Sequence, residues 1–198
     1  MEIATPLFEG RLVCLTPIDH EKDPEIEAKW THDGEYLRML QTEPARPMAP
    51  AQLKKKYEAL EKEAEESKNL FYFAIRTPPN GPSDSGRLLG FARLYWVEWS
   101  HGAAKIQLGI GDRCNRRQGY GSEVLRLLMY YAFSELNLFR LSALVPEYNL
   151  AGRSLFEKAG FVEEVRRRAA INRDGRRWDL IHLGILRAEW EASLESKT

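Results

Sequence analysis

The residues whose types and spacing favour a specific chemistry lie in the short segment 116–122, which reads RRQGYGS. Gly119 and Gly121 allow the backbone to approach a ligand closely and to adopt a positive φ. A strongly apolar stretch follows, and we predict that it is a helix. The first N–H groups of a helix have no partner within it, and together with the helix dipole they attract anions. The segment is therefore predicted to bind phosphate groups.

Two common nucleotide-binding motifs do not fit this segment. A dinucleotide-binding G-x-G-x-x-G motif would start at Gly109 and Gly111, but its third glycine would fall on Cys114. A nucleoside-triphosphate loop needs Gly-Lys followed by serine or threonine, and Gly121 is followed directly by Ser122. The pattern that remains is R-x-x-G-x-G.

Two elements must hold this segment in place. Ahead of it, residues 104–110 alternate between apolar side chains and polar or small ones, which predicts a half-buried strand. Behind it, residues 121–138 form a predicted helix with a single polar stripe, so most of its circumference packs against a sheet. A short apolar strand over 141–145 follows, and then a helix over 149–159 that Gly160 ends.

The rest of the chain predicts more strands and helices. Residues 161–172 and 176–186 flank Asp174-Gly175, a strong hairpin signal. In the first half, strands are predicted over 11–18, 71–76 and 90–97, a Pro- and Gly-rich loop over 77–87, and helices from Asp19 or His20 to about Asp33 and over 51–67.

Composition bounds the class of protein. A chain of 198 residues suffices for one well-buried core, so we predict a single domain over residues 1–198. Its 29 basic residues balance 29 acidic ones, so charge indicates neither nucleic acid nor an anionic membrane as a partner. Cys14 and Cys114 lack metal-ligand spacing, and we predict no metal site. No segment has the length of a membrane span or the character of a signal core, so a reducing cytoplasm is the expected location.

The order of these elements resembles that of the GCN5-related N-acetyltransferase (GNAT) superfamily. Residues 119–139 (GYGSEVLRLLMYYAFSELNLF), 157–161 (EKAGF) and 174–190 are similar to the branch that contains the RimJ and RimL ribosomal-protein N-acetyltransferases. The resemblance is close over residues 106–190 and loose in the first half. It implies an α/β (α+β) single-domain GNAT fold, in which a mixed central sheet of about six to seven strands has helices on both faces and a splayed pair of strands at the coenzyme site.

The resemblance also implies acetyl-coenzyme A as the acetyl donor and assigns residues to it. Leu108 and Ile110 would offer backbone groups to the pantetheine arm. Asn149 would contact the coenzyme from the neighbouring strand end, and Phe156 occupies the position where many members have a tyrosine that acts as the acid. The pyrophosphate would be surrounded, chiefly through main-chain N–H groups, by Arg116, Arg117, Gln118, Gly119, Tyr120, Gly121 and Ser122.

Acetyl transfer needs a neutral amine, a donor to the oxyanion and protonation of the departing thiolate. Phe156 has no hydroxyl, so Tyr148 and Ser154 are the local alternatives for the acid, of which we choose Tyr148. A thiol with a pKa of about 8.5 leaves as a fairly stable anion, so a dedicated acid is not obligatory. Glu98, Asp112 or a water chain remain for the base, and Glu98 is our candidate.

Cys114 lies inside the phosphate loop, where Arg113 and Arg116 are expected to lower its pKa. However, the loop would meet the pyrophosphate, several bonds away from the thioester. We therefore favour direct attack of the amine in a ternary complex over an acyl-cysteine intermediate.

Two functions remain open at this point. The first is transfer of an acetyl group from acetyl-coenzyme A to a primary amine, either a peptide N-terminus or a small amine. The second is a non-catalytic acyl-coenzyme A-binding module, which Phe156 and the absence of an evident base favour. The resemblance further implies a homodimer. The cationic amine would be attracted by Asp33, Glu35, Glu43 and Glu98, and the walls of its pocket are expected among Trp30, Tyr36, Met39, Trp96 and Trp99.

Overall fold

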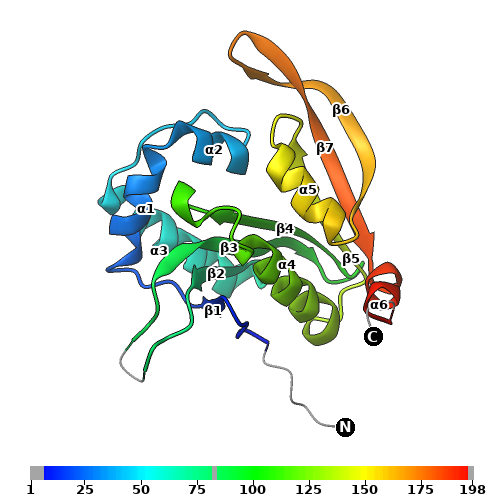
Figure 1. Ribbon diagram of the computed structural model, residues 1–198, viewed down its shortest axis with the longest axis horizontal. Coiled ribbons are helices and arrows are strands. Elements are labelled where there is room, and N and C mark those ends of the chain that lie inside the picture. Colours follow the sequence, from blue (N-terminus) through cyan, green and yellow to red (C-terminus); the bar gives the residue numbers. More distant parts are fainter. Residues whose placement is uncertain (1–6, 82–83, 196–198) are drawn as a thin grey trace.

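The computed structural model describes residues 7–81 and 84–195. These residues form a seven-stranded sheet with the order β1-β2-β3-β4-β5-β7-β6 (Figure 1). Only β4 and β5 pair in parallel among the described strands, so the sheet is mixed, as predicted. The strands are β1 (Cys14–Thr16), β2 (Phe71–Arg76), β3 (Leu88–Glu98), β4 (Ala103–Ile110), β5 (Arg140–Pro146), β6 (Val162–Arg173) and β7 (Arg176–Leu186).

Helices cover both faces of the sheet, with α4 and α5 in front of it and α3 behind it in the view of Figure 1. The β6–β7 hairpin extends well beyond the other strands in the same view. The helices are α1 (Asp23–Thr31), α2 (Gly34–Leu40), α3 (Pro50–Ser67), α4 (Tyr120–Tyr130), α5 (Leu150–Lys158) and α6 (Arg187–Glu195).

The alternation of side chains in the strands separates two cores. In β4, Ala104 and Ile106 are buried in the larger core, together with Leu128 of α4. The smaller core lies among the first three helices and the strands beneath them, and it includes Tyr57 of α3 and Phe91 of β3. Both faces of the sheet are therefore buried, which explains why its central strands are rich in apolar residues.

β4 and β5 pair at one end only. Lys105 pairs with Ser142, and no pairing continues beyond this point. The N–H of Gly111 donates to the carbonyl of Leu89 in β3, at 2.9 Å. Because main-chain groups alternate in direction along an antiparallel strand, those of Leu108 and Ile110 point away from β3, toward the opening between β4 and β5. This opening is the splayed pair that the resemblance implies, and we call it the splay.

Several elements differ from the sequence prediction. β1 is shorter than the strand predicted over 11–18, and α2 and α6 were not predicted. A helix was expected to run through to about Asp33, but the Asp33 side chain instead accepts from the N–H of Glu35 at 3.0 Å and starts α2. The helix predicted over 121–138 is α4 followed by a π-helical turn (Tyr131–Glu135).

Candidate functional site

The predicted phosphate loop connects β4 to α4 at the mouth of the splay. Its first turn is a short 3-10 helix (Arg113–Asn115), which Asp112 caps by accepting from the N–H of Cys114 at 3.1 Å. Arg117 and Gly119 have φ values of 61° and 88°, and Gly119 is the residue just before α4. The first N–H groups of α4 have no partner within the helix, so they are available to an anion.

Gly121 lies where α4, β4 and α5 come together. A Cβ atom at this position would lie 3.5 Å from Leu155 Cδ2 and 3.7 Å from Leu108 Cδ1. These are ordinary contact distances, so a methyl group would fit between the start of the helix and the splay, but a larger side chain would press on Leu155 and Leu108. A ligand that reaches from the α4 N-terminus into the splay would pass this position.

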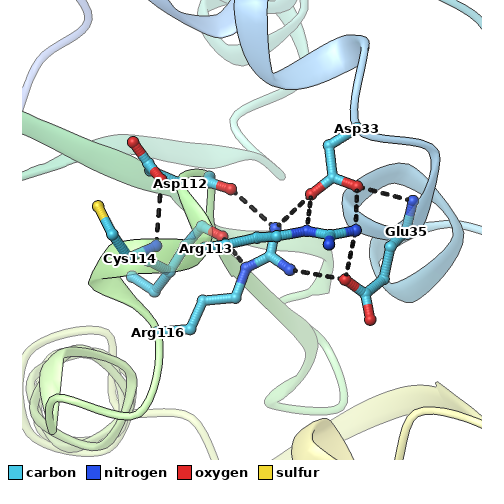
Figure 2. Close-up of polar contacts among 8 residues, drawn as sticks. Asp33, Glu35, Asp112, Arg113, Cys114 and Arg116 are labelled. Carbon is cyan, nitrogen blue, oxygen red and sulfur yellow. Dashed lines mark hydrogen bonds and ion pairs between the residues drawn. The ribbon is translucent and has the colours of Figure 1, made fainter.

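Two arginines of the loop turn toward helix α2 (Figure 2). Arg113 Nε lies 3.0 Å from Asp33 Oδ2, and its Nη2 lies 2.9 Å from Glu35 Oε2. Arg116 Nη2 lies 3.1 Å from Asp33 Oδ2, and its Nη1 lies 3.4 Å from Glu35 Oε2. We call these four side chains the clasp. Its two carboxylates were expected to attract a cationic amine, but they are instead paired with the loop.

The clasp holds the pKa of Asp33 at about 2, chiefly through hydrogen bonds from Arg113 and then from Arg116. Since an aspartate has a pKa of about 3.9 in an unfolded chain, the ionised form stabilises the folded protein by about 2 kcal/mol at neutral pH. We expect this stabilisation to be complete above about pH 5 and to be lost as the pH falls from about 3.9 toward 2.

Denaturant unfolding of the wild type and of Asp33→Asn as a function of pH measures this contribution. Asparagine is also a favourable N-cap residue, so the comparison isolates the charge. The difference in unfolding free energy should shrink on acidification. A difference that is the same at pH 7 and pH 3 would contradict the ion pairing.

Cys114 does not have the environment that the sequence predicts. Its pKa is raised, mainly by a hydrogen bond with the Asp112 carboxylate, whereas we expected Arg113 and Arg116 to lower it. The reason is that both guanidiniums turn toward Asp33. The thiol is thus not activated as a nucleophile, in agreement with direct transfer.

The last turn of α2 bridges the two sides of the splay. Its carbonyl groups have no helical partners, and side chains from other elements donate to them. Tyr148 Oη donates to Arg38 at 2.9 Å and Asn149 Nδ2 donates to Met39 at 3.0 Å, both from the connection between β5 and α5. From β4, Gln107 Nε2 donates to the carbonyl of the last α2 residue at 2.6 Å. Helix α2 is consequently fixed across the splay.

A cavity of about 260 Å³ lies between α2 and the tip of the β6–β7 hairpin. The carboxylate of Asp174 is 3.0 Å from Arg38 Nη1, and the rings of Tyr148 and Trp178 meet edge to face at 5.4 Å. With two carboxylates and two guanidiniums, the cavity carries no excess charge. It is lined by Glu35, Arg38, Met39, Tyr148, Arg173, Asp174 and Trp178.

The structure does not bring all predicted site residues together. Glu98 pairs with Ala103 at the far end of β4 and is exposed. Its partner Ala103 is five residues before Leu108 along β4, which corresponds to about 17 Å. Phe156 is only 7% exposed and packs against Phe161, with ring centroids 5.1 Å apart. Leu155, its neighbour, faces Gly121 instead.

The residues expected to form the walls of the amine pocket do not lie together. Trp30 and Tyr36 are buried in the smaller core, and Trp96 and Trp99 are exposed at the end of β3. Only Met39 of that set lines the cavity.

Glu123 is a positioning residue that was not predicted from the sequence. It lies in the first turn of α4, and its carboxylate accepts from the N–H groups of Arg11, Leu12 and Val13 at 3.1, 2.6 and 2.9 Å. These bonds hold the N-terminal segment against the phosphate loop, where Leu12 approaches Gly119. Only its place on the polar stripe of the predicted helix set it apart in the sequence.

Neither a membrane span nor a metal site is evident in residues 7–81 and 84–195. None of the helices there combines the length and apolar character needed to cross a bilayer. No group of three or more His, Cys, Asp and Glu side chains there is placed to hold a metal ion.

Comparison with known proteins shows a consistent family. A family model described as an acetyltransferase (GNAT) domain matches residues 12–162. The chain is 30% identical over 106 residues to YdaF of Bacillus subtilis, which is provisionally named a ribosomal N-acetyltransferase. The matched segment covers 54% of this chain and 57% of that protein. It is 34% identical over 120 residues to YjcK of the same organism, which is provisionally named an N-acetyltransferase. This match covers 58% of this chain and 59% of that protein. The matches thus span less than two thirds of these relatives.

Solved structures share the fold. The structure superimposes on that of a spermidine N-acetyltransferase from Vibrio cholerae, solved with CoA and spermine, with a TM-score of 0.76 and 18% identity. The superposition covers 92% of this chain and 99% of that one. A crystal structure described provisionally as an acetyltransferase gives a TM-score of 0.78 at 21% identity. This superposition covers 91% of this chain and 96% of that one. At such identities the likeness concerns the fold alone.

Proposed function

Because the chain belongs to the acetyltransferase (GNAT) domain family, we propose that it transfers the acetyl group of acetyl-coenzyme A to a primary amine. One observation carries this proposal. The splay opens beside Gly121, next to the unpaired N–H groups that begin α4. An extended ligand with a phosphate group at one end and hydrogen-bonding amides along its length fits both features.

The chemistry proceeds by direct attack. The neutral amine adds to the thioester carbonyl, a C–N bond forms, and the carbonyl oxygen becomes an oxyanion. The N–H of Leu108 points into the splay, and in our proposal it donates to this oxyanion. The C–S bond then breaks, the thiolate leaves, and the proton of the former amine passes to solvent or to the thiolate.

No side chain of the described site is an evident acid. The hydroxyl of Tyr148 lies at the cavity, but it donates to the carbonyl of Arg38. Phe156 has no proton to give. A thiol with a pKa of about 8.5 leaves as a fairly stable anion near neutral pH, so the step does not require a dedicated acid.

The cavity between α2 and the hairpin is our candidate for the acceptor site. Its Asp174 carboxylate is paired with Arg38, and its Glu35 carboxylate with Arg113 and Arg116. No carboxylate is therefore left over for a polycation. Deprotonating a lysine-like amine (pKa about 10.4) costs about 3 kcal/mol more than deprotonating an α-amine (pKa about 7.7–8.0). We therefore propose a peptide N-terminus or a weakly basic small amine as the acceptor.

A panel of amines tests this proposal. We expect release of coenzyme A thiol and an acetylated product with short peptides that begin with serine or alanine, faster at pH 7 than with spermidine at the same concentration. Spermidine turnover that exceeds that of every peptide would contradict the acceptor class.

The alternative is a non-catalytic acyl-coenzyme A-binding module. Phe156 and the engaged Tyr148 hydroxyl favour it, because neither can protonate the leaving thiolate. In the same panel, tight binding of coenzyme A by calorimetric titration without turnover of any amine would establish this alternative.

A further inference from the structure

The clasp has a geometry that a simple phosphate-binding arginine would not need. Every nitrogen of the Arg116 guanidinium has an acceptor within the chain (Figure 2). In addition to the two clasp carboxylates, Nε donates to the carbonyl of Ile110 at 3.3 Å and Nη2 to that of Gly111 at 2.8 Å. The side chain is 26% exposed. Four of the five N–H groups of Arg116 are thus engaged, and a phosphate could take more than the remaining Nη1 hydrogen only by displacing these partners.

We propose that Arg116 is a positioning residue, which couples the phosphate loop to the acceptor cavity through the clasp and does not bind the pyrophosphate directly. This inference rests on the proposed function. Two carboxylates balance two guanidiniums in the clasp, so it has no net charge to offer an anion. Its role is instead to hold the end of β4, whose last carbonyls it contacts, in a fixed position relative to α2.

Glu35 belongs to both sites. Its carboxylate pairs with Arg113 and Arg116 of the loop and also lines the cavity. Helix α2 is held at its start by the clasp and at its end by Gln107 and Asn149. A shift of the loop therefore moves α2 as a rigid unit. Because α2 forms one wall of the cavity, the shift also changes the shape of the cavity.

Arg117 provides a contrast within the same loop. It is exposed and makes no ion pair with any residue in the described part of the chain. Its charge is thus free to act on phosphates, whereas the charge of Arg116 is already neutralised. The two adjacent arginines have different roles, which the R-x-x-G-x-G pattern alone does not distinguish.

The test compares Asp33→Asn, Arg116→Lys and the double variant with the wild type. Asparagine keeps the N-cap and removes the charge, whereas lysine keeps the charge and loses the planar fork. We measure the Kd of coenzyme A by calorimetric titration and the KM of a short serine-starting peptide at saturating acetyl-coenzyme A. Glu66→Gln, in an exposed ion pair with Lys62 on α3, is the matched control for loss of a surface charge.

We expect each single variant to raise both the Kd and the KM by about fivefold, with kcat changed less than twofold. The double variant should be no worse than the poorer single variant, because both changes break the same contact. Glu66→Gln should change neither constant. If Asp33→Asn does not fold, Glu35→Gln replaces it for the Kd of coenzyme A alone, with the same expected direction, because Glu35 also lines the cavity.

Two results would overturn the proposal while leaving the function intact. If Arg116 contacted the phosphates directly, lysine would preserve binding to within twofold, because lysine also binds phosphate. If Asp33 merely competed with the phosphates, Asp33→Asn would tighten coenzyme A binding. A wild-type protein that does not bind coenzyme A at all would instead refute the proposed function, and the coupling with it.

Discussion

Replacing Gly121 by valine is expected to raise the Kd of coenzyme A about a hundredfold, equivalent to about 2.7 kcal/mol, in a protein that still folds. The side chain would project toward Leu155 and Leu108 and fill the space between the start of α4 and the splay. The backbone at Gly121 is helical, with no positive φ, so a side chain is compatible with the conformation. Calorimetric titration with coenzyme A measures the effect.

The control for this variant is Arg126→Val. It introduces the same β-branched side chain at an exposed position of α4, away from the splay. It should lower helix propensity by a few tenths of a kcal/mol, whereas Gly121→Val raises it, and it should leave the Kd unchanged. If Gly121→Val is folded and binds coenzyme A as tightly as the wild type, the ligand does not pass Gly121 and our placement of it is wrong.

The second large effect is expected from Leu108→Pro, which removes one main-chain N–H. That N–H points into the splay and not toward β3, so the pairing of β3 with β4 loses no hydrogen bond. If it donates to the oxyanion, kcat should fall by about 10²–10³-fold, as happens when a single oxyanion donor is removed. The measurement is steady-state turnover of the serine-starting peptide.

Leu108→Ala separates the N–H from the side chain. It keeps the donor and loses the contact of Leu108 with the core, so its kcat should remain within a few-fold of the wild type. Circular dichroism and thermal unfolding establish that the proline variant is folded. Equal kcat values for the two variants would exclude this N–H as the oxyanion donor.

Much of the fold could be predicted because its signals are local. β2 occupies the residues predicted for it, and the strand, loop and helix order from β4 to α4 follows from alternation, glycine positions and a single polar stripe. Helix α2 was missed because it is only seven residues long and starts one residue after Asp33. Its start depends on the Asp33 side chain, which both caps the helix and pairs with Arg116 in the clasp.

The site could be predicted only in part. The sequence located the phosphate loop and, through the family resemblance, the strand beside it. It placed Arg116 among the phosphate ligands and Tyr148 among the acids, because residue type and neighbouring motif were the only guides. The structure instead pairs Arg116 with Asp33 and lets the Tyr148 hydroxyl donate to Arg38.

The sequence by itself determined that an alternating strand leads into a glycine-containing loop and where a helix presents free N–H groups, because these depend on residues close together in the chain. Only the tertiary structure decided how the charged side chains are used. Arg116 and Asp33 are 83 residues apart, and Tyr148 and Arg38 are 110 apart. The polar partner of a side chain depends on which distant elements pack beside it, and composition and periodicity carry no information about that packing.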